Sequence, residues 1–574
     1  MNNKMKQIIA LTSKTKTVSR LVGADPSVCP PKINLPSIHK SPIPSFPNVS
    51  VGNPFSTQCA SLTSDLPSFL VSFCLFAIPF FNKIKAKIVL IMFVLIFGSI
   101  QLFAANAANW AAFAPLWTAA SGADLNIILT GNISVGANIG AVGRTNLIVI
   151  GNNTSRWSFN GGQYSGFSIS GRSVTFQTHL GLTNFYNPQN GGAMNISNGG
   201  QVYINVSTLT ATNNTGGSGN SGTMTDSTRG GGVFAVSGSG SKLTINAGYA
   251  FFTGNTGQVD SGVIHILGSS VTLAGGEMIF KENTASYMTG NGRGGGAIRL
   301  TGNGADTAYL TISVGTITFD NNFSHDGSSI LLQDAQTVLH VTSMTKKMNV
   351  INGASSYGAI YNRDGSMIFE AKEILIYNNQ ATGNGGAIFL GSPQGKITFR
   401  DTKITLDNNR SATNGGMLYA ADASGQIIFE NSLVYGTSNT ANNGGIIYTV
   451  AGILLTFMNS TSVFIGNTAY NFGGSIYSSG DLKFERGGIE FTSNVSLATN
   501  SQGNIAVVGG TFQILDMYSM IGRYNRAASG GFLYVPNLAF NFNGALMEMI
   551  GNTAFGSGAY GRGGSFYLNG ATAT

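Results

Sequence analysis

Hydrophobic and polar positions recur along most of the chain with a period of about thirty residues. One or two glycines are followed by a small residue and then a large apolar one, as in 385–388 and 444–447. Two residues beyond the second glycine position, all thirteen copies carry a large apolar side chain: Met194, Phe234, Ile264, Ile298, Ile330, Ile360, Ile388, Leu418, Ile447, Ile476, Ile505, Leu533 and Phe566. A position that is apolar in every copy is expected to face a shared core.

Two further registers repeat with the same period. One consists of phenylalanines 27 to 30 residues apart, namely Phe369, Phe399, Phe429, Phe457, Phe484, Phe512 and Phe540. The other is an asparagine six or seven residues before the glycine position, as in Asn255, Asn322, Asn352, Asn379, Asn409, Asn439, Asn467 and Asn525. Short alternating segments such as 396–400, 403–407 and 416–420 lie between Asn/Gly turns, which predicts β-strands and no helix of ten or more residues after Gly122.

Thirty residues with about three short strands are typical of one coil of a parallel β-helix. The sequence therefore predicts an all-β fold: a single-stranded, right-handed parallel β-helix of about 13 coils. Neighbouring coils would lie about 4.8 Å apart, which gives a rod roughly 60 Å long. Like side chains should then stack from coil to coil, asparagines should hydrogen-bond along one corner, and Glu370, Arg400 and Glu430 should place alternating charges on neighbouring coils.

The two ends of the repeat region differ. Residues 109–120 carry Trp110, Phe113 and Trp117 at helical spacing, which predicts a short amphipathic helix that caps the first coils within 108–190. The repeat itself occupies 191–574. Another copy opens at 563–567 and the sequence ends seven residues later, so we expect the repeat to be truncated in this chain.

Charge and composition separate a leader from the repeat. Residues 1–107 hold ten of the 31 Lys/Arg, two of the 23 Asp/Glu and all three cysteines, whereas residues 108–574 hold 75 of the 78 glycines and carry no net charge. The net charge of +8 thus belongs to the leader, and the folded part has no basic field to attract nucleic acid. Without cysteines after the leader, the fold cannot rely on disulfides.

The leader contains the pattern of a secretory signal peptide at 83–107. Lys83, Lys85 and Lys87 precede the apolar run 88–103, and an Ala-x-Ala site predicts cleavage after Ala107 or Ala104. The alternative is a membrane anchor, but the run is shorter than the roughly 20 residues that a spanning helix needs. We expect residues 1–82 to form an unstructured extension, for which a true start further downstream, a long leader and a hairpin anchor are open explanations.

The alternation of two motifs resembles the repeat signature of the chlamydial-type polymorphic outer-membrane proteins. Gly-Gly-Ala-Ile has literal or near copies at 191–194, 295–298, 385–388, 444–447 and 473–476, and Phe-x-x-Asn recurs at 252–255, 280–283, 319–322, 464–467 and 491–494. In that family the repeats build the β-helical passenger of an autotransporter, a surface adhesin and antigen. The resemblance implies export to the outer-membrane surface or beyond, with a host or neighbouring cell-surface glycan or protein as partner.

The chain departs from that family at its C-terminal side. The amphipathic strands of the translocating barrel that would hold the passenger at the outer membrane are not present in this sequence. The resemblance therefore carries over the passenger and its surface role, but neither anchoring nor autotransport.

Groups that could catalyse a reaction are scattered. Parallel β-helices include polysaccharide lyases and hydrolases, which need carboxylates clustered on adjacent coils. Asp320 and Asp407 share a register but lie three coils apart, and Glu370 and Glu430 lie two coils apart with Arg400 between them. The histidines of the repeat show no metal-ligand spacing, and the absence of cysteine there excludes cysteine nucleophiles and cysteine zinc sites. We expect no catalytic residue, cofactor or metal.

Two surface features could bind a partner. Three residues beyond the glycine position, where strand alternation points outward, stand Tyr361, Phe389, Tyr419, Tyr448, Tyr477, Tyr534 and Tyr567. This candidate surface-binding stripe could contact a glycan, a host surface or another rod, or its rings could simply stack and stabilise the sheet. Longer insertions at 213–232, 283–296 and 552–564 leave from one corner and could form a binding face or be neutral.

Three functional hypotheses follow from these observations. The first is a non-catalytic surface or secreted β-helical passenger that mediates adhesion or presents antigen. The second is a secreted polysaccharide lyase or glycoside hydrolase on a pectin-lyase-like β-helix, which would need three carboxylates or an Arg/Lys–Asp set converging on one groove. The third treats the rod as a spacer whose binding part lies in another segment.

Overall fold

The computed structural model divides the chain into two units, 1–99 and 100–574. It describes residues 103–119, 125–151, 158–188, 190–217, 230–286, 294–422, 424–536, 539–544, 546–556, 561–569 and 572–573. The predicted extension 1–82, residues 83–102 of the predicted signal peptide and the three cysteines lie outside the described residues.

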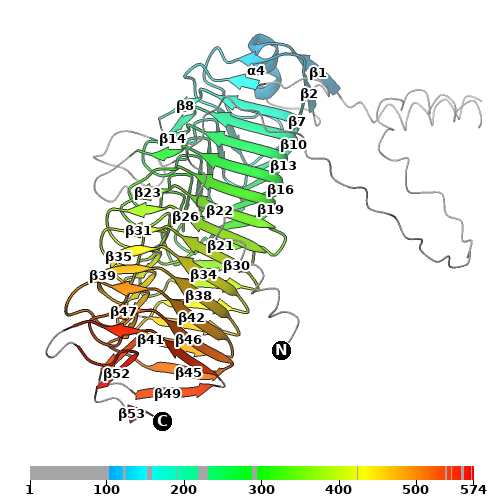
Figure 1. The fold of residues 1–574 in the computed structure, drawn as a ribbon. Coiled ribbons are helices and arrows are strands. Elements are labelled where there is room, and N and C mark those ends of the chain that lie inside the picture. The colour runs from blue at the N-terminus through cyan, green and yellow to red at the C-terminus, as the bar shows by residue number, and fades with distance from the viewer. Residues whose placement is uncertain are drawn as a thin grey trace, which may run out of the picture. The chain divides into compact units, whose positions relative to one another are not determined.

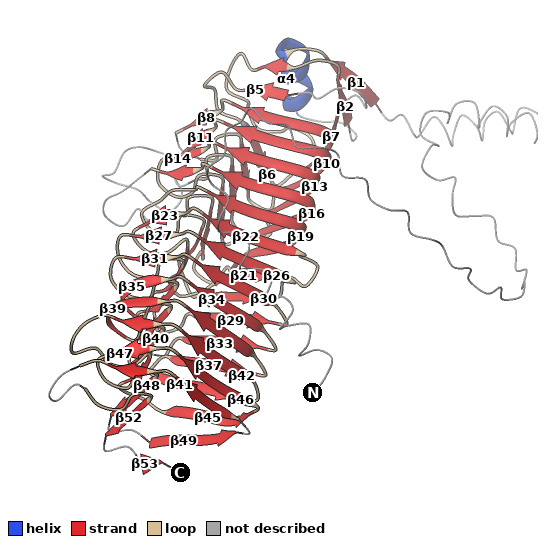
Figure 2. Cartoon of the chain, viewed as in Figure 1, coloured by secondary structure: helices blue, strands red, loops and turns tan. Residues whose placement is uncertain are grey.

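The second unit is a parallel β-solenoid (Figures 1 and 2), as the repeat predicts. One coil shows the plan: β32 (Leu418–Ala420), β33 (Gln426–Glu430), β34 (Leu433–Thr437) and β35 (Thr440–Asn443) lead into β36 (Ile447–Thr449) of the next coil. Strands of successive coils pair in parallel. The strands equivalent to β32 form one 14-stranded sheet, those equivalent to β33 and β34 form a 27-stranded sheet, and those equivalent to β35 form two short-strand sheets.

The number of strands per coil changes along the solenoid. In five early coils one continuous strand replaces the pair seen later: β7 (Ser173–Thr183), β10 (Gln201–Thr212), β13 (Lys242–Thr253), β16 (Ser270–Lys281) and β19 (Ala308–Asp320). Later coils break this strand at a corner where Asp401, Asn431 and Asn459 have φ of 51°, 50° and 49°. Asparagine and aspartate tolerate this left-handed conformation. The break divides the long strand in two, so a later coil has four short strands and not the three that the sequence predicts.

The core is a set of side-chain ladders. Ile388, Leu418 and Ile447 pair in register across three coils, and all three are fully buried. Of the thirteen apolar positions defined above, twelve are fully buried and Phe566 packs partly buried against the same core. The outcome confirms that this position faces inward in every coil.

The phenylalanine register forms a second ladder. The rings of Phe369, Phe399, Phe429, Phe457 and Phe484 stack with centroid distances of 5.0, 5.0, 4.7 and 4.8 Å and interplanar angles of at most 14°. The next ring, of Phe512, lies 6.5 Å away and is turned by 85°, so the regular stack ends there. The side chain of Phe540 lies outside the described residues.

A buried asparagine ladder closes one corner of each coil. Asn409 donates its backbone N–H and its side-chain Nδ2–H to Oδ1 of Asn439, at 3.0 and 3.1 Å, and Asn439 does the same to Asn467, at 2.9 and 3.0 Å. The ladder residues are fully or almost fully buried, and each also donates to a carbonyl of the preceding coil. The hydrogen bonds from coil to coil that the sequence predicted are confirmed.

Asn352 is the exception among the predicted ladder residues. Gly353 occupies the ladder position in that coil and donates its N–H to Oδ1 of Asn379 at 2.9 Å. Asn352, with φ of 56°, instead belongs to an outer row in which its Nδ2 donates to Asp320 and its Oδ1 accepts from Asn378, both at 2.8 Å. The outer row and the ladder occupy adjacent positions in the chain, and the spacing of the asparagines did not show to which of them Asn352 belongs.

The predicted cap is helix α4 (Trp110–Thr118), beside the first coils. Asn109 caps its N-terminus, and the buried rings of Phe113 and Trp117 lie 6.1 and 4.8 Å from that of Phe167. Aromatic contacts of this kind cover the open end of the core. Within the described residues, no helix has the length and hydropathy of a membrane span.

The end of the predicted signal peptide forms the first strand, β1 (Phe103–Ala107). It pairs in parallel with β2 (Leu125–Leu129) over all five residues, and Ala107 is fully buried. Cleavage after Ala104 would shorten this strand, and cleavage after Ala107 would remove it.

Replacing a buried ladder residue should destabilise the solenoid. Asn439→Ala removes a side chain that bonds the coils on both sides and leaves buried donors and acceptors unpaired, so we expect the free energy of unfolding to fall by about 2–4 kcal/mol. Urea unfolding followed by circular dichroism measures this loss. Asn408→Gly is the matched control, because Asn408 is exposed and its φ of 54° suits glycine; an equal loss in both variants would contradict the assignment.

Candidate functional site

The predicted stripe lies on the outer face of the 14-stranded sheet. Tyr361, Phe389, Tyr419, Tyr448 and Tyr477 pair in register on β24 (Ile360–Asn362), β28 (Ile388–Leu390), β32, β36 and β40 (Ile476–Ser478). Neighbouring ring centroids are 4.8, 5.2, 5.3 and 4.9 Å apart. The structure therefore brings these five rings together as one column.

Exposure varies along the stripe. Tyr361 and Phe389 are only 5% and 6% exposed and form a small apolar cluster with Leu331, separate from the main core. The rings of Tyr419, Tyr448 and Tyr477 are partly exposed. The first two rings are buried because they pack against each other and against Tyr357, which is the stacking alternative that the sequence left open.

The last two members form a separate pair. Tyr534 and Tyr567 stack at 4.8 Å with an interplanar angle of 3°, and both are partly exposed. Ala506 stands at the register position between Tyr477 and Tyr534, so the column is interrupted there. The stripe consists of one column of five rings and one of two.

Packing changes the chemistry of the phenols. Burial raises the pKa of Tyr419, and burial together with the neighbouring phenols of Tyr477 and Tyr419 raises the pKa of Tyr448 to about 12. The hydroxyl groups of Tyr419 and Tyr448 therefore stay neutral at any physiological pH.

The outward positions that carry the stripe continue into the early coils, where Arg299 occupies one of them and forms a buried ion pair. The Arg299 guanidinium bonds the Asp260 carboxylate, and these side chains are 1% and 0% exposed. Arg299 also donates to Thr301 at 3.2 Å, and His265 lies 3.7 Å from Asp260. A carboxylate and a guanidinium this deeply buried stabilise each other but are shielded from a polymeric substrate.

Sequence reasoning missed this pair although the repeat contains the signal for it. Asp260 lies two residues before the glycine position of its coil, and Arg299 lies three residues beyond that of the next coil. Aligning the coils places Arg299 in register with His265, and both side chains lie against Asp260.

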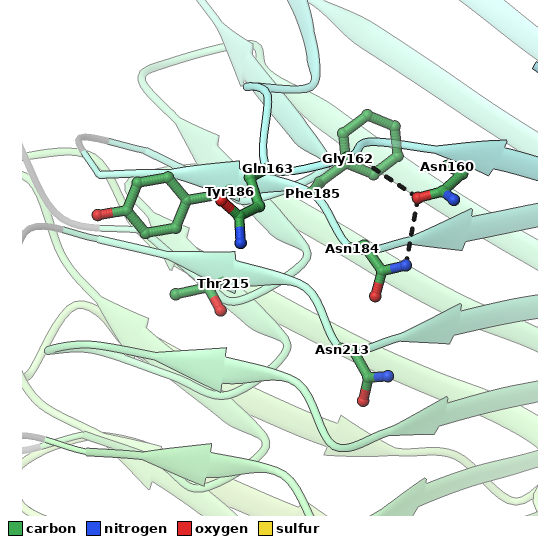
Figure 3. Close-up of a pocket in the computed structure, with 8 residues that line it drawn as sticks. All are labelled: Asn160, Gly162, Gln163, Asn184, Phe185, Tyr186, Asn213 and Thr215. Carbon is green, nitrogen blue, oxygen red and sulfur yellow. Dashed lines mark hydrogen bonds between the residues drawn. The ribbon is translucent and has the colours of Figure 1, made fainter. Parts of the chain in front are cut away.

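A polar pocket of about 610 Å³ lies beside the early coils (Figure 3). It is lined by Asn160, Gly162, Gln163, Asn184, Phe185, Tyr186, Asn213 and Thr215. Within this group, Asn160 Oδ1 accepts hydrogen bonds from Asn184 Nδ2 and from the Gly162 backbone N–H, both at 3.2 Å. None of these residues was a candidate from the sequence, because no chemical motif marks them.

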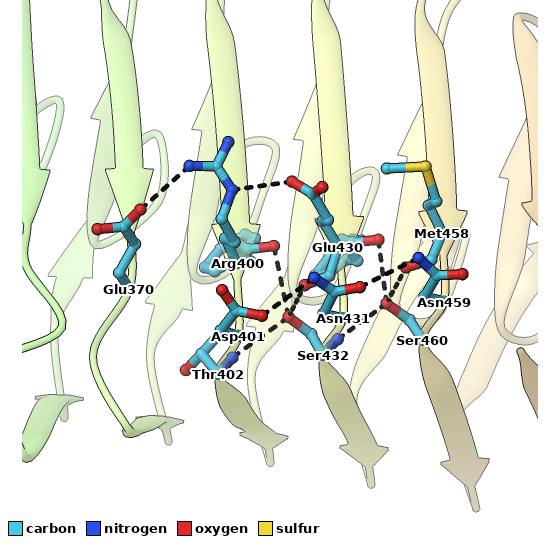
Figure 4. A network of polar contacts seen from close by, with 12 residues as sticks. Glu370, Arg400, Asp401, Thr402, Glu430, Asn431, Ser432, Met458, Asn459 and Ser460 are labelled. Atoms are coloured by element: carbon cyan, nitrogen blue, oxygen red, sulfur yellow. Dashed lines mark hydrogen bonds and ion pairs between the residues drawn. The ribbon is translucent and has the colours of Figure 1, made fainter.

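The predicted alternation of charge is present on the 27-stranded sheet (Figure 4). Arg400 donates from Nη1 to Glu370 at 3.1 Å and from Nε to Glu430 at 2.8 Å. A hydrogen bond from His340 and the charge of Arg400 lower the pKa of Glu370, and Glu430 raises the pKa of Arg400. The carboxylates are thus paired with cations across coils, which leaves no adjacent carboxylate pair for acid–base catalysis here.

No group of three His, Asp or Glu side chains within the described ranges could hold a metal ion. The two Glu–Arg–Glu rows, of which the second is Glu490, Arg523 and Glu548, are instead held by ion pairs between neighbouring coils.

The long insertions leave from equivalent short strands. β11 (Thr215–Gly216) and β17 (Thr284–Ala285) precede the first two and lie in the four-stranded sheet, and β51 (Thr553–Ala554) precedes the third in the eight-stranded sheet. Residues 218–229, 287–293 and 557–560 of these insertions lie outside the described residues. Phe323 links the two sheets by bridges to Thr284 and Ala354, so the predicted common corner is confirmed.

The stripe should resist ionisation in a measurable way. Because the folded pKa of Tyr448 is about 12 and an unfolded tyrosine titrates near 10, its contribution to stability is complete below pH 10. That contribution is lost as the pH rises from about 10 to 12. In an ultraviolet titration of phenolate, the amplitude of the late-ionising phase should be smaller by one tyrosine in Tyr448→Phe than in the unaltered chain; an undiminished late phase would contradict this.

Breaking the buried ion pair should be costly. Arg299→Met leaves the Asp260 carboxylate buried without its cation, and we expect the free energy of unfolding to fall by about 3–5 kcal/mol. Adding Asp260→Asn removes the uncompensated charge, so the double variant should regain part of the loss. Chemical denaturation of both variants tests this, and equal losses would refute the charge argument.

Comparison with known proteins identified no relative of this chain. No family model matches the chain, and searches of curated proteins and of solved structures found no significant match.

Proposed function

We propose that this chain is a non-catalytic, exported β-helical passenger of the autotransporter type, which acts as an adhesin or surface antigen. Its partner would be a glycan or protein of a host or neighbouring cell. The observation that carries the proposal is the column of outward rings at Tyr419, Tyr448 and Tyr477, stacked in register and partly exposed. Partly exposed aromatic rings in a row offer a large contact area at low cost in side-chain entropy.

The architecture supports a binding role. Coils that repeat the same side chains build an extended face rather than a single cleft, and extended faces suit large partners. The Gly-Gly-Ala-Ile and Phe-x-x-Asn repeats support the resemblance to autotransporter passengers, and the run at 88–103 supports export.

A second candidate is a secreted polysaccharide lyase or glycoside hydrolase. The buried set of Arg299, Asp260 and His265 favours it, because an arginine–aspartate set is the feature that such an enzyme would need. Burial of these groups argues against it, since a substrate has to touch the groups that act on it. Incubation of the chain with pectin, alginate and other polysaccharides separates the two: release of reducing or unsaturated ends would overturn the passenger proposal.

Adhesion should depend on the stripe. Beads coated with the full chain are expected to bind epithelial cells, and the triple variant Tyr419/Tyr448/Tyr477→Ser should lower the number of bound beads about tenfold, because it removes three neighbouring rings. Bead counts under flow give the measurement.

The matched control is Tyr249/Tyr309→Ser, which removes exposed tyrosines of the 27-stranded sheet that lie outside the stripe. Circular dichroism checks that every variant keeps its fold. Equal adhesion of the triple variant and the unaltered chain would reject the stripe as the contact surface.

A further inference from the structure

The pocket of Figure 3 lies far along the chain from the stripe, in coils that the proposed function does not use. Its lining includes the buried Phe185, the turn that contains Gly162 and Gln163, and the corners at Asn184 and Asn213. The volume of about 610 Å³ falls within the range of about 300–1,000 Å³ that is usual for ligand sites.

None of the eight lining residues carries a formal charge. Asn160, Gln163, Asn184 and Asn213 contribute four amides, and Thr215 contributes a hydroxyl. Each amide offers two donors and an acceptor, and a hydroxyl offers both. Such a lining matches a neutral ligand that is itself rich in groups that both donate and accept hydrogen bonds.

Part of this hydrogen-bonding capacity is unused. The side chains of Gln163 and Asn213 and the hydroxyl of Thr215 form no hydrogen bond with any described residue, and the two amides are exposed. Asn160 and Asn184 hold each other at 3.2 Å. The pocket therefore combines a fixed pair of amides with groups that are available to a ligand.

The backbone around the pocket is held in place. Gln163 and Asn184 have φ of 76° and 55°, and the Gln163 N–H donates to the Asn184 carbonyl at 3.0 Å. The Tyr186 N–H donates to the Tyr164 carbonyl at 3.0 Å. Fixed main-chain geometry reduces the entropy lost on binding.

The pocket also has one aromatic face. Tyr186, on β8 (Tyr186–Asn187), lines the pocket and is 39% exposed. An exposed ring beside polar groups packs well against a ligand that has one apolar face and many hydroxyls. Pyranose rings have this character, because their axial C–H groups form an apolar face and their hydroxyls lie around the rim.

We propose that this pocket binds a neutral carbohydrate chain, with Tyr186 stacking against one sugar ring and the amides of Gln163 and Asn213 bonding its hydroxyls. An anionic ligand finds no cation among the described residues that line the pocket. Thr215, which lines the pocket, lies on β11, the strand that precedes the first insertion in the chain. The site adds a ligand class to the proposed binding role and is separate from the stripe.

The test is a glycan array that carries neutral and anionic oligosaccharides, probed with the full chain. We expect binding to neutral glycans. Gln163→Gly and Tyr186→Ala should each weaken that binding about tenfold, the change that loss of one or two hydrogen bonds or of one stacking contact produces. Tyr186→Trp keeps an aromatic face and should retain binding.

Two controls keep the outcome interpretable. Glycine suits the positive φ of Gln163, so Gln163→Gly removes the amide without strain, and Asn408→Gly makes the same kind of change outside the pocket. Tyr309→Ala removes an exposed tyrosine elsewhere. Absence of neutral-glycan binding, binding of anionic glycans only, or binding unchanged in Gln163→Gly and Tyr186→Ala would each overturn the inference; bead adhesion through the stripe would be unaffected by that result.

Discussion

The hydrogen bond between equivalent asparagines of neighbouring coils is the constraint on which the structure depends. The side chain of Asn439, for example, accepts two N–H groups from Asn409 in the preceding coil and donates its Nδ2–H to Asn467 in the following coil. Because the bond needs equivalent residues at equivalent heights, it fixes the register between neighbouring coils that both carry the asparagine. The ladders of Ile388, Leu418 and Ile447, the stacked phenylalanines and the outward rings then follow, since all of them require the same register.

Much of the fold could be predicted because the repeat encodes it directly. The inward apolar position, the phenylalanine ladder, the helix at Trp110–Thr118 and the pairing of Arg400 with Glu370 and Glu430 follow from periodicity and from alternation along strands. The prediction was wrong by one residue at Asn352, where Gly353 holds the ladder position. The left-handed backbone of Asn352, with φ of 56°, places its side chain in the outer row, and the spacing of asparagines does not reveal that conformation.

The candidate sites were less predictable, for two physical reasons. Strand alternation gave the direction of Tyr361 and Phe389 correctly but not their burial, because burial depends on neighbours such as Tyr357 that are outside the register. The polar pocket and the ion pair of Asp260 with Arg299 join corners and strands of different coils. Their partners are tens of residues apart, and their residue types are common in any turn.

The asparagine ladder has a consequence for how such a molecule can change its length. Each coil that carries the ladder asparagine presents the same acceptor to one side and the same donors to the other, so such a coil can be excised or duplicated and the cut faces still match. Recombination between repeats would therefore shift the tyrosine column and the polar pocket nearer together or farther apart in whole steps, while the interior stays intact. The distance between the tyrosine column and the polar pocket can therefore change by whole coils without a change in the core.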